Sequence, residues 1–100
     1  MQGQETVTDS VLRAVKRHIS FRHYRLFYFG SRVSGRATAR SDYDVGLEAD
    51  EKIPLEVMAR IREELDEIPV LQKIDLVDFF AAPEGFVRRA KSDMEMIYEQ

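Results

Sequence analysis

The sequence predicts a single α/β domain over residues 1–100, in which helices alternate with strands. Apolar residues recur with the period of a helix near the N-terminus and again between residues 54 and 67. Residues 42–49 alternate between polar and apolar side chains, as a strand with two different faces does. Residues 25–29, Arg-Leu-Phe-Tyr-Phe, hardly alternate and fit a strand that is buried on both faces. One hundred residues can enclose one hydrophobic core but not two.

Caps and breakers set the expected boundaries of these elements. Thr8 or Asp9 can cap the first helix, Pro54 suits the first turn of a later one, and Pro69 ends that helix. Residues 94–99 fit either a continuation of the last helix or a short edge strand. In order, the other expected elements are a helix at about 8–20, a strand at 25–29, a short helical turn at 31–35, a strand at 42–49, a helix at 54–67, a strand at 73–79 and a helix at 83–91.

The charged side of the helix at 54–67 is expected to face solvent. Arg60 and Glu64, and likewise Arg62 and Asp66, are spaced i, i+4, where opposite charges stabilise a helix by a few tenths of a kcal/mol. We therefore interpret this run of charges as a solvated surface and not as a site.

Composition excludes several classes of protein. The chain has no cysteine, so it has neither disulfides nor a thiolate metal site. No apolar run approaches the roughly 20 residues of a membrane span, and the N-terminus lacks the layout of a signal peptide. A cytoplasmic protein with no membrane partner is expected. Residues 1–40 carry eight Lys and Arg against two acids, but no dense basic stripe with interleaved aromatics, so direct nucleic-acid binding is not expected.

One stretch carries a pattern that suggests chemistry. Asp42 and Asp44 alternate along a predicted strand and therefore share a face, where two carboxylates repel each other unless a cation lies between them. Such oxygen ligands suit Mg²⁺, which commonly bridges one or two carboxylates and substrate phosphates. Upstream, Gly30 allows close approach of a ligand, and Ser31 can begin a helix whose N–H groups face an anion. Gly46, on the aspartate face, leaves room for a ligand or relieves crowding between strands. Together these features predict a nucleotide site.

Gly30-Ser31, ten intervening residues and then Asp42-x-Asp44 resembles the signature of the DNA polymerase β-like nucleotidyltransferase superfamily. Within it, the chain is similar to the minimal nucleotidyltransferase (MNT) family, small antitoxin-type proteins that are paired with HEPN-domain proteins. The resemblance implies a small mixed β-sheet flanked by helices, the palm of polymerase β. It also favours the strand for residues 94–99.

A third carboxylate is expected on a later strand, and two aspartates compete for that role. Asp75 and Asp78 are separated by an odd number of residues, so they point to opposite faces and only one can join Asp42 and Asp44. Asp75 lies in mid-strand between apolar residues, where an acid is costly to bury unless it is paired or binds a metal. We therefore expect Asp75 to be the third acid.

The resemblance implies a role for each acid. Asp42 and Asp44 bridge two Mg²⁺ ions, and Asp75 holds the ion on the nucleophile's side or accepts the nucleophile's proton. All three are therefore candidate metal ligands and catalytic residues. ATP is the expected substrate and Mg²⁺ the expected cofactor.

The resemblance also implies a set of nucleotide ligands. Ser31 and the backbone after Gly30 bind the β- or γ-phosphate. Arg32 neutralises the triphosphate, and Arg36 or Arg40 can add to it.

Three functions remain open from the sequence. The leading hypothesis, which the resemblance implies, is a nucleotidyltransferase that moves a nucleoside monophosphate, AMP from ATP, onto a tyrosine of a HEPN-domain toxin and so acts as its antitoxin. The second is a non-catalytic antitoxin or nucleotide-binding subunit that neutralises a HEPN partner by contact. The third is a transferase acting on a small molecule without any partner. The sequence leaves the acceptor open, and a homo-oligomer as well.

Overall fold

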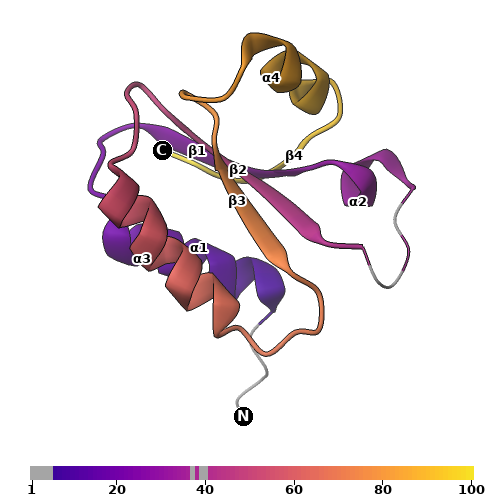
Figure 1. The fold of residues 1–100 in the computed structure, drawn as a ribbon, viewed down its shortest axis with the longest axis horizontal. Helices are drawn as coiled ribbons and strands as arrows, with labels where there is room; N and C mark the ends of the chain where they lie inside the picture. Colours follow the sequence, from indigo (N-terminus) through magenta and orange to yellow (C-terminus); the bar gives the residue numbers. More distant parts are fainter. Residues whose placement is uncertain (1–5, 37, 39–40) are drawn as a thin grey trace.

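The computed structural model of this chain describes residues 6–36, 38 and 41–100, and they form a mixed four-stranded sheet in the order β3-β2-β1-β4 (Figure 1). Along the chain the elements are α1 (Val7–His18), β1 (Tyr24–Phe29), α2 (Ser31–Ser34), β2 (Tyr43–Ala49), α3 (Leu55–Asp66), β3 (Ile74–Asp78), α4 (Glu84–Lys91) and β4 (Glu95–Glu99). Strand β1 pairs antiparallel with β2 and β4, whereas β2 and β3 run parallel and are joined through α3. The predicted α/β class is confirmed, and the C-terminal segment is a strand.

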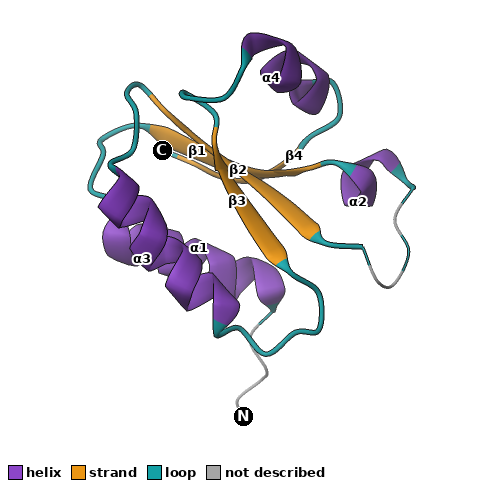
Figure 2. Cartoon of the chain, viewed as in Figure 1, coloured by secondary structure: helices purple, strands orange, loops and turns teal. Residues whose placement is uncertain are grey.

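Helices α1 and α3 lie side by side and cover one face of the sheet (Figure 2). The larger core lies beneath them and contains, from the sheet, Leu26, Val45 and Leu47, all fully buried. The alternation predicted for residues 42–49 therefore directs Val45 and Leu47 toward α1 and α3. Both helices have 12 residues, and in the described part of the chain no helix is long and apolar enough to cross a membrane.

The other face of the sheet is partly covered by α4 and carries a smaller, aromatic core, so this single domain has two clusters of buried residues where the sequence predicted one core. Phe27, Phe29 and Phe79 are buried there, with Phe27 and Phe79 in an edge-to-face contact at 4.8 Å between ring centroids. A Cβ atom at Gly46 would lie 2.4 Å from Cε2 of Phe27 and 2.8 Å from Cε1 of Phe79. Gly46 thus makes room for these rings, and Phe27 is its partner on the neighbouring strand β1. Of the two predicted reasons for this glycine, the structure supports the relief of crowding between strands and not room for a ligand.

The helix starts differ from the predicted ones by one or two residues. Thr6 caps α1, because its side chain accepts a hydrogen bond from the backbone N–H of Asp9 at 3.0 Å. Thr8, one of the two predicted caps, lies inside the helix, and its hydroxyl contacts the Tyr28 hydroxyl at 2.9 Å. Pro54 occupies the N-cap of α3 and not its first turn.

Glu64 ties α3 to α1 instead of pairing along its own helix. Its Oε1 lies 2.7 Å from Nε2 of His18 and 3.3 Å from Nε of Arg17. Because these partners come from a different helix, the predicted pair of Arg60 with Glu64 does not form in the described structure.

Candidate active site

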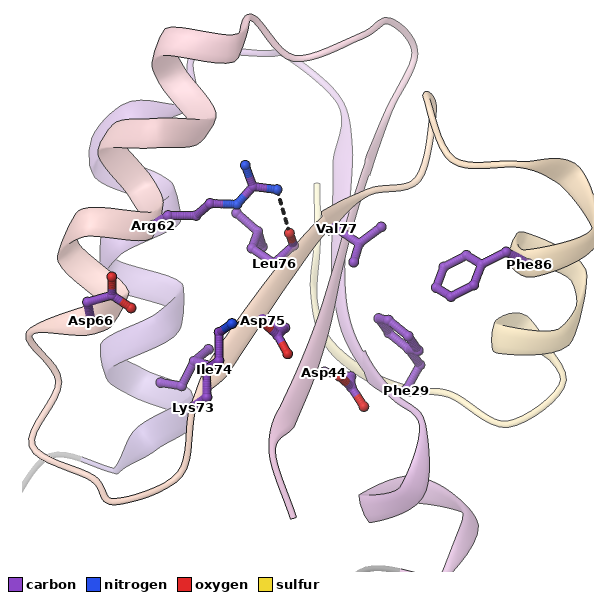
Figure 3. Close-up of a pocket in the computed structure, with 10 residues that line it drawn as sticks. All are labelled: Phe29, Asp44, Arg62, Asp66, Lys73, Ile74, Asp75, Leu76, Val77 and Phe86. Carbon is purple, nitrogen blue, oxygen red and sulfur yellow. Dashed lines mark hydrogen bonds and ion pairs between the residues drawn. The ribbon is translucent and has the colours of Figure 1, made fainter. Parts of the chain in front are cut away.

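Asp44 of β2 and Asp75 of β3 are neighbours on the face of the sheet that carries α4. The two residues are partners in the parallel register of these strands, so their side chains project to the same face. Both carboxylates line a cavity of about 580 Å³ at the β3 side of the sheet (Figure 3). The structure therefore brings together two of the three predicted acids from separate parts of the chain.

The Asp44 carboxylate carries a charge that the fold does not compensate. Burial raises the pKa of Asp44 above its usual value of 3.8, and the negative charges of Asp75 and Asp42 raise this pKa further. Within the described residues, no cation or hydrogen-bond donor pairs with this carboxylate. A bound cation would offset both the burial and the repulsion, and for this reason Asp44 stays a candidate ligand for a divalent metal ion.

Gly30 connects the predicted phosphate turn to the first acid. Its φ of +82° lies in the region that favours glycine, and a Cβ atom here would stand 2.4 Å from Oδ2 of Asp44. Any other residue at this position would displace the carboxylate. The end of β1 and the start of β2 are therefore in direct contact at the point where phosphate and metal are predicted to meet.

Asp42 does not lie on the same strand as Asp44, although the sequence predicted that it would. It is exposed and precedes β2, which begins at Tyr43 and not at Asp42. Among the described residues, no three His, Cys, Asp or Glu side chains are gathered closely enough to hold a metal ion. The negative charge of Asp42 nevertheless acts on the site, because it contributes to the raised pKa of Asp44.

Asp78, the competing third acid, has a structural role at the end of β3. Its Oδ2 accepts a hydrogen bond from the N–H of Ile53 and its Oδ1 one from the N–H of Phe80, both at 3.0 Å. Asp75 instead has one ion pair, with Nζ of Lys73 at 3.4 Å. Asp75 and Asp78 therefore point to opposite faces of β3, as their odd spacing predicts. Asp78 binds backbone N–H groups of two loops, whereas Asp75 lines the cavity.

Arg62 is exposed, as predicted for the solvated face of α3, and it also lines the cavity of Asp44 and Asp75. Its Nη2 donates a hydrogen bond to the Leu76 carbonyl at 2.9 Å, on the outer edge of the sheet (Figure 3). Asp66 lines the same cavity, but the predicted pair of Arg62 with Asp66 does not form in the described structure, because Arg62 donates to β3 instead. No local pattern identifies such a residue, because its partner comes from another element.

The predicted phosphate ligands fall into two groups. Arg32 donates from Nε and Nη2 to the Ser41 carbonyl at 3.0 and 2.7 Å, and its guanidinium stacks on the Tyr43 ring at 4.1 Å. It therefore braces the segment that leads into β2. Arg36 lines a second cavity with Gly30, whereas Arg40 lies outside the described residues.

This second cavity lies between α2 and α4 and measures about 460 Å³. Gly30, Ser31 and Arg36 line it from one side. Residues of α4, Phe86 and Arg89 among them, line it from the other side, and sequence reasoning did not identify them as part of a site. Phe29 and Phe86 also line the first cavity, so the two hollows share these aromatic rings.

A mixed sheet with neighbouring acids on two parallel strands, and a glycine turn against the first acid, is the arrangement of a nucleotidyltransferase palm. The family pattern of polymerase beta, nucleotidyltransferase, matches residues 20–100. This chain belongs to that family, which confirms the predicted superfamily.

Among known proteins, the chain is 32% identical over 63 residues to the probable protein adenylyltransferase MntA of Haemophilus influenzae, covering 63% of this chain and 55% of the relative. The chain thus spans about half the length of this curated relative.

Two solved structures show the same fold. A chain of a toxin–antitoxin structure with AMP-PNP has a TM-score of 0.69 at 18% identity, over 93% of this chain and 73% of that one. A chain of the structure of a tri-AMPylated Shewanella oneidensis HEPN toxin in complex with an MNT antitoxin has a TM-score of 0.65 at 15% identity, over 94% and 71%. These likenesses confirm the predicted fold.

Proposed function

We propose that this protein is a Mg²⁺-dependent nucleotidyltransferase that transfers AMP from ATP to a hydroxyl acceptor. The observation that carries the proposal is the unpaired carboxylate of Asp44 beside that of Asp75, with Gly30 in contact with Asp44. Membership of the polymerase beta nucleotidyltransferase family supports the same chemistry. The structure with AMP-PNP among its neighbours of the same fold supports ATP as the donor.

The transfer is a substitution at the α-phosphorus of ATP. The acceptor oxygen forms a bond to this phosphorus, the bond from phosphorus to the β-phosphate oxygen breaks, and pyrophosphate leaves. Asp75, which faces the cavity, accepts the proton of the acceptor hydroxyl. Two Mg²⁺ ions held by Asp42, Asp44 and Asp75 would stabilise charge on the entering and departing oxygens.

The phosphates would be held by the turn that follows β1. Gly30 and Ser31 offer backbone N–H groups and a hydroxyl, and Arg36 offers a cation from the same cavity wall. Arg32 would act mainly by bracing the loop into β2, since its guanidinium already has partners.

The acceptor in this proposal is a tyrosine of a HEPN-domain toxin, and the protein is the toxin's antitoxin. The relative from Haemophilus influenzae is named a probable protein adenylyltransferase, and a neighbour in fold comes from a complex with a tri-AMPylated HEPN toxin. The setting would be the cytoplasm, where ATP and Mg²⁺ are plentiful.

The test mixes the purified protein, Mg²⁺ and ATP with a HEPN-domain partner and weighs the partner by intact-mass spectrometry. The expected result is a gain equal to one or more AMP groups, which disappears with Asp42→Asn plus Asp44→Asn. No gain, or the same gain with the double variant, contradicts the proposal.

A second candidate is an antitoxin that acts by binding alone. It is favoured by the exposed position of Asp42 and by the lack of a closed three-acid set among the described residues. In that case the Asp42→Asn plus Asp44→Asn variant would still rescue cells from the toxin as well as the unaltered protein does.

A further inference from the structure

The wall of the second cavity formed by α4 has no assigned role. This cavity lies between α2 and α4, next to the carboxylate site. From the position and charge of its lining residues, we propose that Arg89 of α4 binds the polyphosphate of the nucleotide, from the wall opposite Gly30 and Ser31. The inference rests on the proposed function and adds a nucleotide-binding residue to it.

Two neighbouring arginines of α4 differ in how they are engaged. Nη2 of Arg88 lies 3.0 Å from Oε1 of Glu84 in an i, i+4 ion pair. The Arg89 guanidinium has no ion pair within the described residues and lies back along the helix, 3.8 Å from where a Cβ atom on Gly85 would stand. Its charge is therefore available to a ligand, and a guanidinium can bind phosphate oxygens through two parallel hydrogen bonds.

The helix that carries Arg89 is fixed at two points. Nζ of Lys91 lies 2.7 Å from Oε2 of Glu48 on β2. One turn before Arg89, the Phe86 ring packs edge-to-face on Phe29 at 5.7 Å between centroids. Phe29 is the residue before Gly30, so this contact couples α4 to the phosphate turn. Arg89 lies between the two anchors in the sequence of α4, and its exposed side chain lines the cavity.

The charges of the two cavities suit different parts of a nucleotide. Arg36 and Arg89 face a single acid, Asp93, in the cavity between α2 and α4. The other cavity is lined by three acids, Asp44, Asp66 and Asp75, and by two cations, Arg62 and Lys73. Lys73 pairs with Asp75 and Arg62 donates to the Leu76 carbonyl, so the charge of Asp44 stays unpaired and a metal ion would be needed before phosphates could approach it. The outer phosphates therefore belong with Arg36 and Arg89, while the α-phosphate extends toward Asp44.

The test measures the affinity of the protein for AMP-PNP and for AMP, each with Mg²⁺, by titration calorimetry. Arg89→Ala is expected to weaken AMP-PNP binding about tenfold, the size of one charge-assisted hydrogen-bond contact that is partly exposed to solvent. AMP binding should change by less than about twofold, because AMP lacks the outer phosphates. Arg88→Ala is the matched control and should bind both ligands as the unaltered protein does.

A change in the ratio of the two affinities separates phosphate binding from a general loss of structure, which would weaken both ligands together. If the unaltered protein binds AMP-PNP and Arg89→Ala binds it equally well, or loses both ligands to the same degree, the role of Arg89 is overturned while the proposed function stands. If the unaltered protein binds neither ligand, the proposed function itself fails, and the inference with it.

Discussion

Asp44 and Glu48 are two acids on the same face of β2, with Gly46 between them on that face. Their surroundings in the fold are opposite. Glu48 forms ion pairs with Arg25 and with Lys91, the latter at 2.7 Å. Asp44 has no such partner among the described residues and has two other acids nearby. Near one end of β2 the carboxylate, Glu48, is thus paired with cations, and near the other end the carboxylate, Asp44, is not.

The two carboxylates differ in pKa accordingly. Burial opposes ionisation of Glu48, but the hydrogen bonds and charges of Lys91 and Arg25 outweigh it and lower the pKa of Glu48 below 4.5. At Asp44, burial and then the charges of Asp75 and Asp42 all raise the pKa above 3.8. The comparison indicates that Glu48 serves the fold, because it anchors α4, whereas Asp44 is kept for a ligand that the fold itself does not supply.

The largest effect is expected from removing the charge of Asp44. Asp44→Asn should lower AMP transfer to the acceptor by about 10²- to 10³-fold, as for the loss of one group that stabilises charge in a transition state. Glu48→Gln should retain most of the transfer rate, because Glu48 has its partners within the fold. Initial rates of partner AMPylation compare the Asp44→Asn and Glu48→Gln variants. Equal losses of rate in the two variants would contradict the assignment of Asp44 to the active site and of Glu48 to the fold.

The contact between Gly30 and Asp44 can be broken by a single methyl group. Gly30→Ala should cost about 1–3 kcal/mol of stability and most of the activity, because the added Cβ is strained at φ +82° and meets Oδ2 of Asp44. Gly35 provides the control, since its φ is +85° but no atom lies within 4 Å of the added Cβ. Gly35→Ala should cost about 1 kcal/mol and leave the transfer rate nearly unchanged. Urea denaturation and transfer assays measure both; similar activities in the two variants would contradict a role for the Gly30 contact.

A smaller effect is expected at Glu48, the acid of β2 that is paired with cations. Glu48→Gln should lower the free energy of unfolding by about 1–2 kcal/mol at neutral pH, because it weakens the hydrogen bonds to Arg25 and Lys91. A lowered pKa in the folded state means that Glu48 stabilises the protein above pH 4.5 and that this contribution is lost as the pH falls through the folded pKa. Urea denaturation at neutral and acidic pH should therefore show the difference shrinking with acid. A difference that grows in acid would contradict the assignment.

The smallest effect has the opposite sign. Asp44→Asn should raise the Tm of the protein without added metal by about 2–4 °C at neutral pH, because it removes a partly buried charge that two neighbouring acids repel. A raised pKa in the folded state means that the stabilising contribution of Asp44 is complete below pH 3.8 and is lost as the pH rises through the folded pKa. The gain in Tm should therefore vanish in acid, and differential scanning calorimetry at several pH values measures it. A Tm that falls in the variant would show that Asp44 is compensated after all.

Much of this arrangement can be predicted from the sequence, because period and parity are local properties. The odd spacing of Asp75 and Asp78 showed that only one of them could lie beside Asp44, and the apolar neighbours of Asp75 selected it. Alternation in residues 42–49 identified the face of Asp44. Contacts between distant elements were not predictable. Arg62 and Arg89 resemble other charged residues on helix surfaces, and only the packing of α3 and α4 against the sheet brings them to cavities.

We expect a divalent cation to bind between Asp44, near the start of β2, and Asp75. Paramagnetic Mn²⁺ can replace Mg²⁺ at such oxygen sites, and it broadens the NMR signals of nearby amides. With AMP-PNP present, sub-stoichiometric Mn²⁺ should broaden the amide signals of Gly30, Asp44 and Asp75 first and spare that of Glu48. Broadening centred on the acids of α3, or no selective broadening at all, would contradict this expectation.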